Sequence, residues 1–301
     1  MALDPKISAY LEGVRRLGGA PLWETPVAEA REAADQGADE LFGVADAVAQ
    51  VSDTDAGGVP VRIYAPHPDA ASPTATAIVY FHGGGWVIGS IRSHDRVCRT
   101  LAARAGVPLI AVDYRLAPEH PFPAAIEDAW AVTEWAVERY ERVVVAGDSA
   151  GGQLAASVAL RARDAGFALA LQALIYPVTN HAFDTESYIK FTDPASLNEP
   201  QMRWFWDHYL SGDGSGETQD HSPLRALDVT GVAPALVITA EADPLRDEAE
   251  AYAQRLRDAG VAVDLHRYEG MIHGFVRMSS VIDQAGEAIT EVAEAVRRVG
   301  G

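Results

Sequence analysis

The chain has 301 residues, 48% of them hydrophobic, so it can bury the core of one large α/β domain or of two smaller ones. Its formal net charge of −19 argues against nucleic-acid binding, which needs clustered Lys and Arg side chains. The sequence contains no apolar run of about 18 residues that would predict a membrane span, and its start lacks a secretory pattern, so we expect a cytoplasmic protein.

The first 45 residues are predicted to form a helical segment of their own. Residues 5–18 and 26–41 both have helical periodicity, and Ile7, Leu11 and Val14 share one face of the first helix. Because the segment precedes the first strand, it is either a cap over the active site or a packing appendage.

Two short strands, Asp46–Ser52 and Val59–Tyr64, are expected next. The acidic residues between them resemble a calcium loop, but Tyr64 stands where such a loop needs a bidentate glutamate. The pattern therefore favours a hairpin turn.

From Thr76 onward, apolar strands alternate with amphipathic helices, which predicts a mainly parallel sheet with helices on both faces. The expected strands are Ala77–Phe81, Pro108–Asp113, Arg142–Ala146, Leu169–Tyr176, Ala235–Ala240 and Ala262–Tyr268. The expected helices are Asp95–Ala105, Ala124–Arg139, Gly151–Ala165, Arg246–Ala259 and Ile282–Val299. Residues 46–301 are thus predicted to form one α/β domain, interrupted at about 183–216 by an aromatic-rich insertion predicted to be a helical lid.

The residues Gly147–Gly152, GDSAGG, stand between a predicted buried strand and a predicted helix. A serine between glycines at such a corner is the G-x-S-x-G nucleophile elbow. The tight turn strains the serine and exposes its hydroxyl, and the N–H groups that follow, Ala150 first, lie at a helix N-terminus. Ser149 is therefore the candidate nucleophile.

A glycine-rich loop, His82–Trp86 or HGGGW, directly follows the predicted strand Ala77–Phe81. An HGGG loop ahead of the nucleophile is the oxyanion-hole element of many esterases. No G-K-[ST] or G-x-G-x-x-G pattern accompanies it, which argues against the alternative of a phosphate loop.

Acyl transfer by serine also needs a base and an orienting acid. Glu241, Asp243 and Asp247 compete for the acid, and Asp243 is favoured because it stands at the end of a predicted strand. His273 follows in a loop and completes the order Ser, Asp, His, whereas His266 lies within a strand and has the features of a structural side chain.

No cofactor or metal is expected. The histidines form no H-x-x-x-H or H-x-H pair that would indicate a metal site. The lone cysteine, Cys98, cannot form an internal disulfide and is predicted to be a buried, inert thiol.

Together, HGGGW, Asp113–Glu119 (DYRLAPE), GDSAGG, Asp243-Pro244-Leu245 and His273-Gly274-Phe275 resemble the hormone-sensitive-lipase-like family of carboxylesterases, bacterial family IV of the α/β-hydrolase superfamily. The resemblance implies an α/β-hydrolase fold with a mostly parallel eight-stranded sheet and an N-terminal helical cap over residues 1–45. It implies Ser149 as nucleophile, His273 as base and Asp243 as its partner. It further implies an oxyanion hole formed by the N–H groups of Gly83, Gly84 and Ala150.

Further residues of these motifs have secondary roles. We expect His82 to shape the glycine loop, and the Tyr114–Glu119 run to brace it with Arg115 and Glu119 able to pair. Asp148 is either structural or borders the substrate pocket. Four aromatic residues either line that pocket or belong to ordinary core and lid packing: Trp86, Tyr188, Trp204 and Phe205.

The resulting prediction is a serine carboxylesterase acting on short- to medium-chain acyl esters. The same motifs fit an amidase, a carbamate hydrolase or a lipase, because they describe acyl transfer and not the leaving group. A non-catalytic small-molecule receptor is the remaining alternative, which the presence of all three triad residues disfavours. Family members often dimerise, so the resemblance also implies a homodimer through Ala262–Tyr268 and Ile282–Val299.

Overall fold

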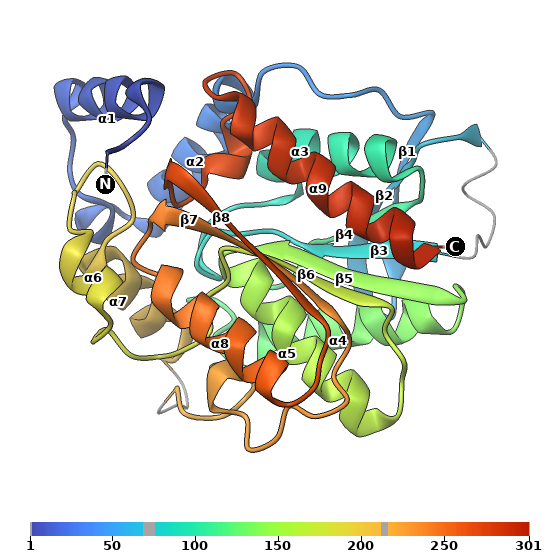
Figure 1. Ribbon diagram of the computed structural model, residues 1–301. Coiled ribbons are helices and arrows are strands. Elements are labelled where there is room, and N and C mark those ends of the chain that lie inside the picture. Colours follow the sequence, from blue (N-terminus) through green and yellow to red (C-terminus); the bar gives the residue numbers. More distant parts are fainter. Residues whose placement is uncertain (1, 69–75, 212–215, 301) are drawn as a thin grey trace.

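The computed structural model describes residues 2–68, 76–211 and 216–300. An eight-stranded sheet with strand order β1-β2-β4-β3-β5-β6-β7-β8 forms its centre (Figure 1). Strands β3 to β8 run parallel, while β2 is antiparallel to both β1 and β4. The strands are β1 (Gln50–Ala56), β2 (Val59–Ala65), β3 (Thr76–Phe81), β4 (Leu109–Val112), β5 (Arg142–Asp148), β6 (Leu171–Ile175), β7 (Ala235–Ala242) and β8 (Val263–Ile272). The predicted fold class is confirmed.

Helices cover both faces of the sheet, as the nearly continuous apolar sequences of the central strands require. Figure 1 shows α2, α3 and α9 on one face and α4, α5 and α8 on the other. The α-helices are α1 (Pro5–Leu17), α2 (Val27–Phe42), α3 (Ile91–Ala105), α4 (Ala124–Val137), α5 (Ala150–Ala165), α6 (Glu186–Lys190), α7 (Glu199–Tyr209), α8 (Arg246–Asp258) and α9 (Asp283–Gly300). Single 3₁₀ turns occur at η1 (Leu22–Glu24), η3 (Pro223–Arg225) and η4 (Phe275–Arg277). Among the residues described, no helix is long and apolar enough to cross a membrane.

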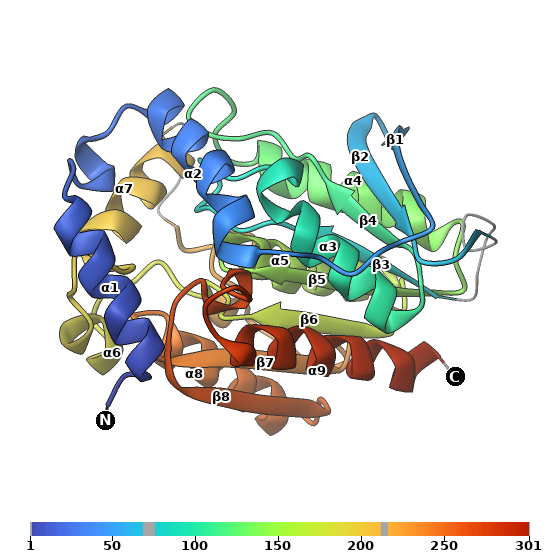
Figure 2. The same cartoon turned by 90° about the horizontal axis from the view of Figure 1, so that it is seen from above.

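The N-terminal helices and the predicted insertion lie together at one end of the sheet. Both views place α1, α6 and α7 at the end of the molecule where the parallel strands end (Figures 1 and 2). Helix α1 buries Ile7 and Leu11, and Arg15 on it forms an ion pair with Asp193 between α6 and α7. The two segments, distant in sequence, therefore contact each other directly. Residues 212–215 of the predicted insertion lie outside the described residues.

The hairpin at the edge of the sheet differs from the predicted strand boundaries. Strand β1 begins at Gln50 rather than Asp46, and it includes the acidic residues assigned above to the turn. Asp53 lies opposite Arg62 on β2, and their side chains form an ion pair with Oδ1 and Nε 2.6 Å apart. The turn shrinks to Gly57 and Gly58, both with positive φ, which is the backbone that a two-residue hairpin needs.

Cys98, on α3, is fully buried. Burial, the largest cause, and the charge of Asp95 raise the pKa of its thiol well above the ordinary value. Because the thiolate is the reactive form of cysteine, this thiol is inert, as predicted.

The two hairpin glycines allow a matched test of how the hairpin packs on α4. A Cβ on Gly57 would lie 2.8 Å from the carbonyl oxygen of Ala131, whereas a Cβ on Gly58 would meet nothing within 4 Å. Both substitutions with alanine strain a left-handed backbone by about 1 kcal/mol, so Gly57→Ala should lose a further ~1–2 kcal/mol from the clash. Urea denaturation of both variants measures the difference, and equal losses would contradict this packing.

Candidate active site

Strand β5 delivers Ser149 to a strained turn in front of α5. Ser149 has φ 57° and ψ −120°, a conformation that non-glycine residues rarely adopt. The close approach of neighbouring backbone forces it. A Cβ on Gly147 would lie 2.4 Å from the backbone of Gly151, and one on Gly151 would lie 1.9 Å from the carbonyl oxygen of Phe81. The glycines of the motif are therefore a steric requirement of the elbow.

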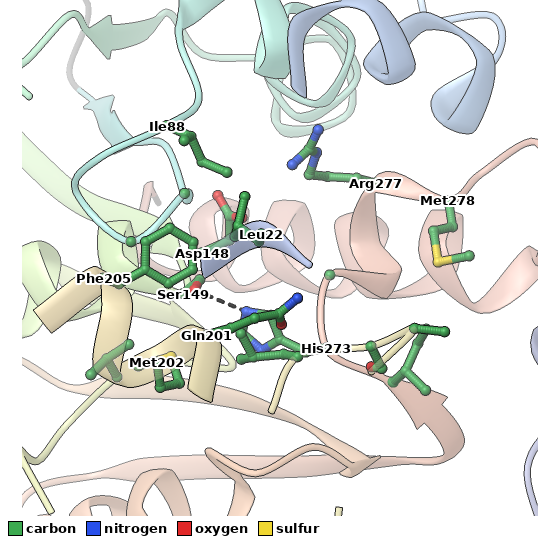
Figure 3. Close-up of a pocket in the computed structure, with 18 of the residues that line it drawn as sticks. Leu22, Ile88, Asp148, Ser149, Gln201, Met202, Phe205, His273, Arg277 and Met278 are labelled. Carbon is green, nitrogen blue, oxygen red and sulfur yellow. Dashed lines mark hydrogen bonds between the residues drawn. The ribbon is translucent and has the colours of Figure 1, made fainter. Parts of the chain in front are cut away.

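Ser149, His273 and Asp243 form a continuous hydrogen-bonded chain. Nε2 of His273 lies 2.9 Å from Oγ of Ser149 (Figure 3), and its Nδ1 lies 2.7 Å from Oδ2 of Asp243. The tautomer that satisfies both contacts carries its proton on Nδ1 and accepts the serine proton at Nε2. Asp243 is fully buried, and its Oδ1 accepts the backbone N–H of Leu245 at 2.9 Å, which fixes the carboxylate toward His273.

The competing residues have other partners. Glu241 accepts the backbone N–H of Gly270 at 2.8 Å, and Asp247 accepts that of Ser187 at 2.7 Å. His266 is exposed on β8, with its Nδ1 2.6 Å from Oε1 of Glu291. Their geometry therefore assigns these three side chains to structural roles.

The oxyanion loop corrects one predicted donor. The N–H of Gly83 donates to Oδ1 of Asp148 at 2.9 Å, so it is already occupied. Gly84 and Gly85 instead border the same cavity as Ser149. Among the hydrogen bonds of the described residues, the N–H groups of Gly84, Gly85 and Ala150 donate to no acceptor. The available donors thus lie one residue further along the glycine run than the resemblance implied.

His82 and Tyr114 hold the base of this loop. The Nδ1 of His82 lies 2.8 Å from the carbonyl oxygen of Gly83, and the Tyr114 hydroxyl donates to the carbonyl oxygen of His82 at 2.7 Å. Burial, reinforced by the charge of His94, lowers the pKa of His82 to about 3. His82 is therefore neutral at physiological pH and shapes the loop without gaining a proton.

The expected pairing of Arg115 with Glu119 is wrong. Arg115 binds Asp128 at the start of α4, with Nη2 2.8 Å from Oδ1. Glu119 binds Arg31 of α2, which also donates to the backbone carbonyls of Val87 and Ala117. The run still braces the loop, but through partners in two different helices, which join the N-terminal segment to the oxyanion loop.

Asp148 is buried, and it both holds neighbouring groups in place and borders the cavity. Its carboxylate accepts hydrogen bonds from the Tyr80 hydroxyl at 2.8 Å and from Gly83, and it pairs with Nε2 of His94. Burial alone would raise the pKa of this carboxyl, but His94, the charge of Arg277 and the Tyr80 hydrogen bond hold it below the ordinary aspartate value. Asp148 therefore remains an anion beneath the pocket.

A cavity of about 370 Å³ opens above Ser149 and His273. Asp148 and Phe205 border it, as predicted, and the Phe205 ring lies directly against Gly85. The other predicted pocket residues do not line it. Trp86 and Tyr188 are buried in the core and Trp204 packs against Phe205 and His208. Trp86 stacks on Tyr209 with centroids 4.1 Å apart, which is the packing alternative given above.

Several lining residues gave no signal in the sequence. They come from the N-terminal helices, the insertion and η4: Tyr10, Leu22, Leu41, Ser196, Leu197, Gln201, Met202, Arg277 and Met278. Each belongs to a segment that reaches the pocket only through tertiary packing. In the parts of the chain that the structure describes, no group of three or more His, Cys, Asp or Glu side chains is arranged to hold a metal ion.

Comparison with known proteins finds relatives that are similar in sequence. Residues 78–277 match the family model described as an alpha/beta hydrolase fold. The chain is similar to the ethyl acetate hydrolase of Pseudomonas putida, with 38% identity over 99% of both chains. It is also 38% identical to the carboxylesterase NlhH of Mycobacterium tuberculosis, over 80% of this chain and 78% of that relative.

Solved structures of esterases are also similar to this chain, in both sequence and fold. A thermostable esterase from Pseudomonas putida ECU1011 is 36% identical, with a TM-score of 0.92 over 99% of this chain and 97% of that one. The hyperthermophilic esterase of the archaeon Pyrobaculum calidifontis is 37% identical, with a TM-score of 0.90 over 99% of both chains.

The strain at the elbow predicts an unusual effect on stability. Ser149→Gly should relieve the backbone, whereas Ser149→Ala keeps a Cβ in the strained conformation. Glycine loses more backbone entropy on folding, which offsets part of the relieved strain. The net free energy of unfolding of Ser149→Gly should still be about 1 kcal/mol higher than that of Ser149→Ala. Thermal unfolding of the two variants, both without the hydroxyl, makes the comparison, and a less stable glycine variant would contradict it.

Proposed function

The chain belongs to the hormone-sensitive-lipase-like carboxylesterases of the α/β-hydrolase superfamily, and we propose that it hydrolyses short- and medium-chain acyl esters through an acyl-enzyme on Ser149. The observation that carries the proposal is the chain of hydrogen bonds from Asp243 through His273 to Ser149. A histidine oriented in this way can remove the serine proton as the hydroxyl attacks.

In the acylation step, Oγ of Ser149 attacks the ester carbonyl while Nε2 of His273 takes its proton. Negative charge develops on the carbonyl oxygen, which the N–H groups of Gly84, Gly85 and Ala150 are positioned to receive at the N-terminus of α5. His273 then gives its proton to the departing alcohol. Asp243 stays ionised and stabilises the imidazolium.

In the deacylation step, water takes the place of the alcohol. His273 accepts a proton from this water as it attacks the acyl-enzyme, and the acid leaves as Ser149 recovers its proton. The net reaction is ester plus water to acid plus alcohol. The same three side chains serve both halves of the reaction, so each of them is required for turnover.

The N-terminal helices and the insertion are proposed to act as cap and lid. Tyr10 on α1, Leu22 on η1 and Leu41 on α2 all border the cavity, as do Gln201 and Met202 on α7. Apolar walls from these two segments favour acyl chains of limited length, because they enclose the pocket on the side away from the sheet.

The predicted homodimer is part of the same proposal. Strand β8 is at the edge of the sheet, and its first seven residues are partly or fully exposed. An edge strand with unpaired backbone groups is available to pair with a second copy.

The central test is hydrolysis of nitrophenyl esters of increasing acyl length by the wild type and Ser149→Ala. We expect a decline beyond medium chains and a loss of at least about 10⁴-fold in kcat for the variant. A fluorophosphonate should label the wild type at Ser149 and leave the variant unlabelled. Full activity in the variant would refute the mechanism, and faster cleavage of a matched anilide than of the ester would favour an amidase.

The orienting acid has a natural control in the neighbouring helix. Asp243→Asn should lower kcat by roughly 10³–10⁴-fold, because the amide cannot stabilise the imidazolium in the same way. Asp247→Asn removes a carboxylate that binds Ser187 and Arg246, and it should leave kcat within about threefold. Steady-state kinetics of both variants tests whether Asp243 is the orienting acid. An equal loss of kcat in the two variants would contradict this assignment.

A further inference from the structure

Arg277 places a cationic side chain in the wall of the substrate cavity. It ends η4, four residues after His273, and it borders the same cavity as Ser149, Gly84 and Gly85. Figure 3 shows its side chain directed toward the side of the pocket that Ile88 and Asp148 occupy. A ligand bound at Ser149 therefore shares a cavity with this guanidinium group.

The guanidinium group pairs with no side chain or backbone group among the residues that the structure describes. In the described parts of the chain, the Arg277 side chain takes part in no hydrogen bond or ion pair, and its Nε is buried without an acceptor. Guanidinium groups present five N–H donors in a planar fork that matches a carboxylate. Leaving a buried donor such as Nε unpaired is unfavourable, so a ligand acceptor that reaches it would supply a hydrogen bond that no described residue supplies.

Asp148 does not supply that group. Its oxygens already accept hydrogen bonds from Tyr80 and Gly83, and His94 lies beside them. Arg277 acts on Asp148 only through its charge, as one of several causes that hold down the pKa of the carboxyl. The positive charge thus offsets the repulsion that Asp148 would exert on an anionic ligand, while the donors of Arg277 remain available.

We propose that Arg277 determines specificity by binding a free carboxylate on the substrate. The favoured substrates are then esters with a second, ionised carboxyl group, either half-esters of dicarboxylic acids or acyl esters of hydroxy acids. The inference rests on the proposed esterase function and adds its substrate class. The reaction consumes one water and breaks one ester bond, and the second carboxylate is unchanged.

The experiment compares charged and neutral esters of matched length. Monoethyl succinate, glutarate and adipate are paired with ethyl butanoate, pentanoate and hexanoate to test a carboxylate on the acyl side. Acetyl esters of hydroxy acids, paired with the corresponding alkyl acetates, test the alcohol side. The wild type should have a higher kcat/KM on the charged member of one series, with an optimum in the number of methylenes, since Ser149 and Arg277 are fixed relative to each other.

Arg277→Met should lower the ratio of charged to neutral kcat/KM by roughly 10–100-fold, mainly through KM, as expected for losing a charge-assisted hydrogen bond. Arg277→Lys, which keeps the charge but not the fork, should retain part of the preference. Arg16→Met is the matched control, because it removes one positive charge from an exposed pair on α1 and should leave the ratio unchanged.

Product inhibition gives a second measurement that does not depend on cleaving the charged ester. Succinate, glutarate or adipate should competitively inhibit the hydrolysis of a neutral ester by the wild type. This inhibition should be weaker in Arg277→Met. If Arg277→Met fails to fold, Arg277→Gln replaces it. If Arg277→Met slows charged and neutral esters equally, Arg277 only compensates Asp148 and the proposal is wrong. Failure of the wild type to cleave any ester through Ser149 would instead refute the proposed function.

Discussion

The close packing of β5, α5 and β3 at the elbow is the constraint on which the site depends. The backbone of Gly151 lies so near the carbonyl oxygen of Phe81 that even a methyl group would overlap it. That contact brings the start of α5 against the ends of the central strands, and Ser149 can complete the turn only with a positive φ. Its hydroxyl then meets His273, and Ala150 follows directly as the first residue of α5. One steric condition thus positions the proposed nucleophile next to the N-terminus of α5, whose first N–H is the proposed oxyanion donor.

Asp148 extends this constraint from the elbow to the oxyanion loop. It precedes the nucleophile in the chain, and its buried carboxylate binds the N–H of Gly83 and the hydroxyl of Tyr80. The glycine loop is therefore positioned by the residue next to Ser149. Because an ionised carboxylate accepts several donors at once, it joins β3, β5 and, through His94, α3. Arg31 connects helix α2 to the residues beside this loop, because its side chain donates to the carbonyl oxygens of Val87 and Ala117.

Features governed by local sequence could be predicted, and those governed by tertiary partners could not. The alternation of strands and helices identified the sheet, and motif order singled out Ser149, Asp243 and His273, which the structure joins by hydrogen bonds. The choice among three successive glycines failed at Gly83, because only the folded chain shows that Asp148 occupies its N–H. Arg115 and Glu119 lie close in sequence, yet they pair with residues on two different helices, Asp128 on α4 and Arg31 on α2. Likewise, lining residues such as Tyr10 and Met202 carry no motif, since they reach the cavity only through packing.

The balance of charge bears on what the cavity can bind. The chain has 43 acidic and 24 basic residues, so an arginine has many carboxylates to pair with, as Arg31, Arg115 and Arg161 do. Arg277 pairs with none of the described residues although Asp148 borders the same cavity, because Tyr80, Gly83 and His94 hold the oxygens of Asp148. The acidic surface repels an approaching anion, but physiological salt screens that repulsion beyond about 8 Å. Within the cavity, where screening is weaker, the nearest charges determine whether an anionic group binds. The guanidinium of Arg277 is one of these charges.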